Sequence, residues 1–194
     1  MTTGQARLPG EALMAHNPPQ PAAERITPFS GDPLVVGIVP GQSPLVTLTA
    51  ASLATAIGAP LVLFAYVDPG RYVVEERADG TVRHESMSPD SLDDWQGTRD
   101  ELRAQVAATL PDVPFEWEVR YLAGRPDRAL THLARAVDAA AIVIGARKPH
   151  RGMDFAARLQ GSVSVHLAHH QHRPVITVPL AVVDWKDTES PWAR

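Results

Sequence analysis

Five short runs of apolar, strand-forming residues follow one another along the chain, and four longer segments with helical spacing separate them. The run Leu34–Val39 is apolar throughout, which is typical of a central parallel strand buried on both faces. Strands that alternate with longer helices predict a parallel sheet with helices on both faces and right-handed crossovers. The expected fold is therefore α/β, a single Rossmann-like domain. The predicted strands are residues 34–39, 60–67, 115–122, 140–144 and 175–178.

Capping signals and apolar spacing place the helices between these strands. The first helix is expected over residues 43–57, with Gly58 ending it. Ser88-Pro89-Asp90 predicts the start of the second helix, and Pro126 that of the third. The fourth is expected over residues 165–170. On the first helix, the side chains expected on the buried face are Leu45, Leu48, Leu53, Ala54 and Ile57.

The ends of the chain differ in composition from its middle. Residues 1–32 are rich in Pro, Ala and Gly, which predicts a flexible N-terminal tail, and the polar stretch 184–194 predicts a C-terminal tail. Residues 33–183 form the expected domain. Its polar insertion, about 68–88, carries the turn signal Asp79-Gly80. Both a small β-ribbon and a disordered loop are consistent with this insertion.

Composition excludes several classes of function. The formal net charge of −4 gives no reason to expect nucleic acid or an anionic membrane as a partner. The absence of cysteine excludes disulfides, thiolate zinc sites and cysteine nucleophiles. No apolar stretch approaches the ~20 residues of a membrane span, and no signal-peptide core is evident, so a soluble cytoplasmic protein is expected.

The tetrapeptide Gly161-Ser162-Val163-Ser164 follows a strand and a basic loop that starts at Gly145, and it precedes a predicted helix. The first backbone N–H groups of a helix lack intrahelical partners and, with the helix dipole, favour an anion. The hydroxyls of Ser162 and Ser164 would add donors, and Gly161 would let a phosphate approach the backbone. The alternative is that Ser162 only caps its helix.

Sheet topology favours the anion site over the simple cap. Ligands of open α/β sheets bind at the carboxyl ends of the strands, where the strand order reverses. With the first strand central and the second and fourth on either side, this crevice lies between the first and fourth strands. The loops expected there are Pro40-Gly41-Gln42-Ser43 and the segment from Gly145 to Ser164.

The same segments resemble the universal stress protein family over residues 33–180. The resemblance implies strand order 3-2-1-4-5, counted along the chain, and a homodimer through the last strand, Val175–Val178. The matching stretches are Val35–Ile38, Gly124-Arg125-Pro126, Ile142–Gly145, Leu159–Ser164 and Arg173–Pro179.

One branch of this family binds ATP through the pattern glycine, two residues, glycine, nine residues, glycine, then serine or threonine. Gly145 and Gly161-Ser162 match its ends, whereas Lys148 stands at the second glycine and Gly152 is the candidate to take over that role. No carboxylate follows the first strand, where ATP-binding members have one that contacts the nucleotide. The implied nucleotide-binding residues are Pro40, Gly41, Val67, Gly145, Arg147, Gly152, Gly161, Ser162, Val163 and Ser164.

In this assignment Val67 would offer backbone groups to adenine, and Arg147, Lys148 and Arg151 would pair with phosphates. The alternative for each of these three cations is a solvated position in a basic loop. No catalytic constellation is evident, so at most slow ATP hydrolysis is expected. His166 and His170 lie one helical turn apart, but two histidines need further ligands, so no metal site is expected. Two hypotheses follow: a regulatory module that binds ATP, with Mg²⁺, or a related nucleotide, and a nucleotide-independent dimeric scaffold of the same fold.

Overall fold

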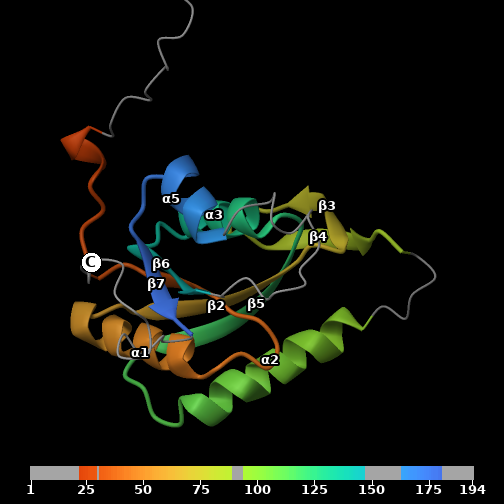
Figure 1. The fold of residues 1–194 in the computed structure, drawn as a ribbon, viewed down its shortest axis with the longest axis horizontal. Helices are drawn as coiled ribbons and strands as arrows, with labels where there is room; N and C mark the ends of the chain where they lie inside the picture. Colours follow the sequence, from red (N-terminus) through yellow and green to blue (C-terminus); the bar gives the residue numbers. More distant parts are fainter. Residues whose placement is uncertain (1–21, 30, 89–93, 147–162, 181–194) are drawn as a thin grey trace, which may run out of the picture.

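A five-stranded parallel sheet forms the centre of the computed structural model, which describes residues 22–29, 31–88, 94–146 and 163–180 (Figure 1). The strand order is β5-β2-β1-β6-β7. Counted along the chain within this sheet, that is the predicted order 3-2-1-4-5. The strands are β1 (Leu34–Gly37), β2 (Leu61–Asp68), β5 (Glu116–Ala123), β6 (Ala141–Ala146) and β7 (Val175–Pro179).

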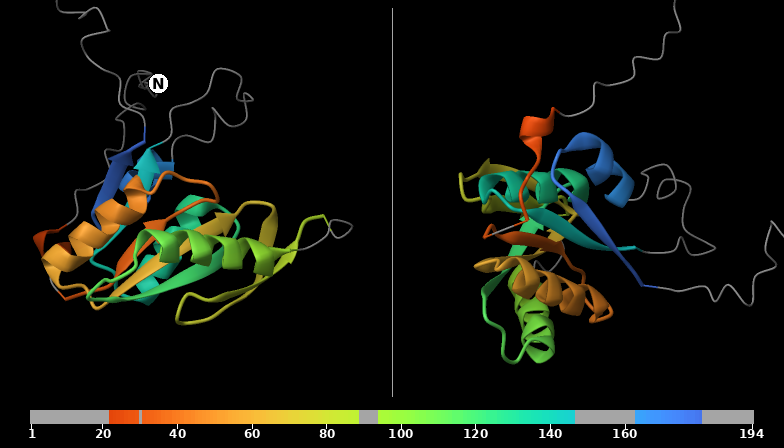
Figure 2. Two further views of the ribbon diagram at one scale, coloured as in Figure 1. Left: turned by 90° about the horizontal axis from the view of Figure 1, so that it is seen from below. Right: turned by 90° about the vertical axis from the view of Figure 1, so that its left-hand side faces the viewer.

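Helices cover both faces of this sheet, as predicted. Helices α1 (Leu45–Ile57) and α2 (Trp95–Thr109) lie on one face, and α3 (Pro126–Ala136) and α5 (Val163–His170) lie on the other (Figures 1 and 2). A short 3-10 helix, Ala23–Arg25, precedes β1. Within the described ranges, no helix is long and apolar enough to span a bilayer.

The central strand β1 contributes to two hydrophobic cores. Leu34, Val35 and Val36 are all fully buried, at 0% exposure. Val36 packs with α1 and α2 residues such as Val46 and Leu102, whereas Val35 packs with residues of α3 and α5. Because successive side chains of a strand point to opposite faces, β1 must be apolar at every position.

The buried face of α1 differs in part from the one expected. Ala54 is buried and Leu53 and Ile57 pack against the core, as expected, but Leu45 and Leu48 are each 48% exposed. The other buried residues are Val46, Thr47 and Ala50. The helix therefore packs on the sheet through small and β-branched side chains, and two of its large leucines lie outside the core. Gly58 does end the helix, in the left-handed conformation with φ 67°.

The predicted start of α2 at Ser88 is also wrong, because the helix begins at Trp95. The carboxylate of Asp94 accepts a hydrogen bond from Gly97 N at 2.8 Å and so satisfies a free N–H group of the first turn. Ser88 instead donates its N–H to the hydroxyl of Ser86 at 3.1 Å. Residues 89–93 lie outside the described residues.

The insertion after β2 is a β-ribbon, so the ribbon alternative is correct. Strand β3 (Arg71–Glu76) pairs antiparallel with β4 (Val82–Ser86). Asp79 accepts hydrogen bonds from the hydroxyl and N–H of Thr81, which lower the pKa of its carboxyl. Gly80 adopts φ 77°, and a Cβ there would lie 2.8 Å from Leu133 Cδ1, so the turn rests closely on α3.

A buried arginine fixes the segment before β7. The Arg173 guanidinium donates to Ala139 O at 2.6 Å and to the Asp138 carboxylate at 2.7 Å. Asp138 precedes β6 with φ 53°, a left-handed conformation that Asp and Asn tolerate better than most residues. The contact joins the start of β6 to the start of β7, at the edge of the sheet.

We expect Arg173→Ala to lower the free energy of unfolding by about 1–3 kcal/mol, because the buried Ala139 carbonyl loses its donor. Asp138→Asn is the matched control, since Asn keeps the acceptor and the backbone conformation, and it should change stability by less than ~0.5 kcal/mol. Urea denaturation followed by circular dichroism measures both variants. If Arg173→Ala and the wild type have the same free energy of unfolding, the hydrogen bonds of Arg173 do not stabilise the fold.

Candidate functional site

The strand order reverses between β1 and β6, and the loops that follow these two strands lie at one edge of the sheet. Gly37, the last residue of β1, pairs in register with Ile144 of β6. The chain leaves β1 toward β2 on one side of it, whereas β6 leads to β7 on the other. Ligand crevices of open α/β sheets form at such a reversal.

Two glutamine side chains hold the loop after β1. Gln42 N donates to Val39 O at 3.2 Å, and the Gln42 side-chain oxygen accepts from Val39 N at 3.0 Å. Gly41 has φ 66°, and its N–H donates to the side-chain oxygen of Gln105 on α2 at 3.0 Å. The side-chain oxygen of Gln42 thus accepts a backbone hydrogen bond, and its NH₂ group remains as the donor for other partners.

Gly145 lies directly against this loop. A Cβ on Gly145 would be 2.6 Å from Gln42 Nε2, 2.8 Å from Leu180 Cδ1 and 3.1 Å from Val46 Cγ2. Only a glycine leaves room for these three side chains. The structure therefore places the loop of Pro40 and Gly41 beside Gly145, on the α1 side of the sheet.

Other residues proposed from the sequence lie on the opposite face. Val67 of β2 is 7% exposed and belongs to the core beneath α3. Val163 packs against the same core, and Ser164 lies half-buried in the first turn of α5. The proposed residues therefore come from both faces of the sheet. Six of those proposed for the nucleotide or its phosphates lie outside the described ones: Arg147, Lys148, Arg151, Gly152, Gly161 and Ser162.

A charged cluster joins α3 to the first turn of α5. Arg125 Nη2 is 2.8 Å from Asp127 Oδ2 and 3.3 Å from His166 Nδ1, and His166 Nδ1 is 3.4 Å from Asp127 Oδ2. Partial burial raises the pKa of Asp127, but the hydrogen bond and charge of Arg125 outweigh it, so the net pKa is lowered. The carboxylate is ionised at neutral pH and holds Arg125 beside α5.

Sequence reasoning missed this cluster. Arg125 is separated from His166 by 41 positions, and no local pattern signals that pairing. The rings of His166 and His170 lie 5.8 Å apart, as their helical spacing implies. Over the ranges that the structure describes, no group of three or more His, Cys, Asp or Glu side chains is arranged to hold a metal ion.

Comparison with protein families identifies the domain. The model of the universal stress protein family matches residues 32–179. The chain belongs to this family. No match was found among curated proteins.

Solved universal stress proteins share this fold. The structure of one from Archaeoglobus fulgidus aligns with a TM-score of 0.53 at 23% identity, covering 77% of this chain and 94% of the other. The structure of the universal stress protein from Archaeoglobus fulgidus in complex with dAMP aligns with a TM-score of 0.52 at 22% identity, covering 76% of this chain and 97% of the other. A universal stress protein in complex with cAMP aligns with a TM-score of 0.50 at 21% identity, covering 78% of this chain and 99% of the other.

In this universal stress protein, a polar and aromatic cluster anchors the base of the ribbon. Arg71 is buried, with Nη1 3.0 Å from His84 Nδ1 and Nε 3.6 Å from the Asp68 carboxylate. Tyr121 of β5 donates its hydroxyl to Asp68 at 2.5 Å, and burial together with that bond raises the pKa of Tyr121. The His84 ring also packs edge-to-face against Trp95, at 5.4 Å between centroids. The ribbon is therefore tied to β2, β5 and α2.

Burial, followed by the charge of Arg71, lowers the pKa of His84 below its ordinary value of 6.5. Between that value and the lower folded pKa, the unfolded chain binds more protons than the folded one, so stability falls as pH falls below about 6.5. We expect His84→Gln to reduce the loss of stability between pH 7.5 and pH 5.5, measured by urea denaturation. The exposed His169→Gln is the control, and an unchanged loss in His84→Gln would contradict this role.

Proposed function

We propose that this universal stress protein is a regulatory module that binds ATP or a related nucleotide in the crevice between β1 and β6. Two solved relatives of the same fold are complexes with dAMP and cAMP, which supports an adenine nucleotide as the ligand class. The strand-order reversal at β1 and β6 supports the location. The single observation that carries the proposal is the cationic group held next to the start of α5.

The phosphates would lie at the start of α5. The start of α5 is the positive end of its helix dipole, which favours an anion. Arg125 is held beside this turn through His166 and Asp127. The glycine pattern in the sequence adds Gly161 and the hydroxyl of Ser162 immediately before the helix. Mg²⁺ would be bound partly by the phosphate oxygens of ATP, as is usual for Mg²⁺ at phosphate-binding sites.

The ribose end differs from that of ATP-binding members of the family. Where they have a carboxylate after the first strand, this chain has Gln42, whose NH₂ group lies over Gly145. Anion binding at a helix start needs no side-chain carboxylate, so phosphate recognition survives this difference. Val67 would still offer its backbone to adenine, because a backbone contact tolerates many side chains. The proposed site therefore recognises phosphate more strongly than ribose.

Calorimetric titration with ATP and magnesium tests this proposal. We expect ATP to bind with micromolar affinity. Arg125→Gln should weaken ATP binding about tenfold, because a hydrogen bond to a charged group is lost. Adenosine, which has no phosphate, should bind the variant nearly as well as the wild type. Arg135→Gln, which removes an exposed arginine from the far end of α3, is the matched control. Ser162→Glu should abolish binding by placing negative charge at the phosphate position. The site is wrong if the wild-type protein gives no binding heat with ATP, or if the Ser162→Glu variant binds ATP as tightly as the wild type.

The second candidate is a nucleotide-independent dimeric scaffold. Two observations favour it: Gln42, Leu180 and Val46 crowd around Gly145, and β7 is an edge strand of the sheet. An unpaired strand edge is a ready surface for pairing with a second chain. Thr177 is an exposed residue in the middle of β7.

We expect the protein to be a homodimer through β7 and Thr177→Lys to make it a monomer, because two like charges would meet at the interface. Light scattering on a size-exclusion column measures the mass. Ser52→Lys, at an exposed position on α1, is the control for the added charge. A dimer that survives Thr177→Lys would place the interface elsewhere.

A further inference from the structure

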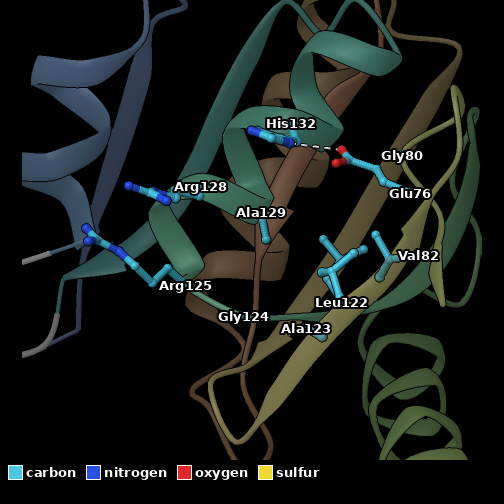
Figure 3. Close-up of a pocket in the computed structure, with 11 residues that line it drawn as sticks. Glu76, Gly80, Val82, Leu122, Ala123, Gly124, Arg125, Arg128, Ala129 and His132 are labelled. Atoms are coloured by element: carbon cyan, nitrogen blue, oxygen red, sulfur yellow. Dashed lines mark hydrogen bonds and ion pairs between the residues drawn. The ribbon is translucent and has the colours of Figure 1, made fainter. Parts of the chain in front are cut away.

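A cavity of about 240 Å³ lies between the ribbon and α3, away from the β1–β6 crevice (Figure 3). Its ribbon side is formed by β3, β4 and the turn between them, and the opposite side by α3 and the end of β5. Its lining residues are Val73, Glu76, Gly80, Val82, Leu122, Ala123, Gly124, Arg125, Arg128, Ala129 and His132.

The cavity exists because the ribbon is held away from α3 while small residues line the gap. Glu76 Oε1 is 2.9 Å from His132 Nδ1, and Gly80 rests on Leu133. Between these supports, Ala123, Gly124 and Ala129 leave the space unfilled that larger side chains would occupy. Val82 and Leu122 supply apolar surface. The ribbon and α3 therefore border a partly open space with mainly apolar walls.

The two ends of the cavity differ in charge. The Glu76–His132 bridge closes one end, and the side chains of Arg125 and Arg128 extend from the other end toward α5 (Figure 3). Arg125 is occupied by Asp127 and His166. Within the described ranges Arg128 makes no ion pair, so its charge is available at the open end. The α3 N-terminus adds a partial positive charge there.

We propose that this cavity binds a small aromatic carboxylate, with the ring between Val82 and Ala129 and the carboxylate at Arg128. The volume admits a single substituted ring but not a nucleotide, since sites for larger ligands measure roughly 300–1,000 Å³. The apolar walls select the ring, and the cationic end selects an anion over a neutral analogue. Arg125, at one end of the cavity, is the one residue shared with the site proposed for the nucleotide, and the proposed ring and carboxylate contacts do not use it, so this site stands or falls separately from the proposed function.

NMR titration of the full ¹⁵N-labelled chain tests the proposal, with benzoate as the probe and benzamide as its neutral isostere. We expect benzoate to shift the amide resonances of Val82, Ala123, Gly124 and Ala129, with a dissociation constant in the millimolar range typical of a fragment. Benzamide should bind at least about fivefold more weakly. No shift at these residues, or equal binding of the two probes, would overturn the proposal.

Two variants with matched controls locate the ligand. Ala129→Leu fills the cavity and should abolish the benzoate shifts, whereas Ala104→Leu, at an exposed position on α2, should not. Arg128→Gln removes an exposed charge without touching the core and should weaken benzoate about fivefold, the effect of an exposed ion pair, while Arg135→Gln leaves it unchanged. Unaltered binding in Arg128→Gln would overturn the assignment of the carboxylate.

A competition experiment separates this site from the nucleotide crevice. ATP with magnesium, added to the benzoate complex, should leave the benzoate shifts in place, because the proposed benzoate contacts, Val82, Ala129 and Arg128, are not among the residues proposed for the nucleotide. If ATP displaces benzoate from the same resonances, the cavity is part of the nucleotide site and the separate site is wrong. If ATP does not bind at all while benzoate does, the proposed function fails and this inference stands.

Discussion

Burial of β1 on both faces is the constraint on which the rest of the structure depends. Leu34, Val35 and Val36 leave no surface in water, so one pair of helices must cover each side of the sheet. The later strands are added on both sides of β1, with β2 and β5 on one side and β6 and β7 on the other. The strand order reverses between β1 and β6 as a result, and this is the kind of position at which open α/β sheets bind ligands.

Continuous apolar runs and capping signals were sufficient to predict the strands, because they are local and strong, whereas the strand order was implied by the resemblance to the family. The sequence was insufficient for details that depend on packing distance. Leu45 and Leu48 fit the helical spacing of a buried face, yet both are half exposed, and Val46 and Ala50 are buried in their place. The start of α2 depends on the Asp94 cap, which competed with the equally plausible signal at Ser88.

The candidate site was predictable only where it follows from topology. The loops after β1 and β6 could be placed together, because parallel strands end at a common edge, and Gly145 does lie against the loop that contains Gln42. The Arg125–Asp127–His166 cluster could not, because it joins side chains from two helices brought together only by folding. The cavity beneath the ribbon is likewise a product of tertiary structure, set by small residues whose spacing carries no periodic signal.

The ribbon pairs only with itself: β3 and β4 form a separate two-stranded sheet rather than extending the main one (Figure 1). Its residues contribute no backbone hydrogen bond to the register of the five central strands. Selection can therefore change the length and sequence of this insertion without altering the pairing of the central strands. In evolutionary terms the ribbon is a module attached to the framework of the sheet.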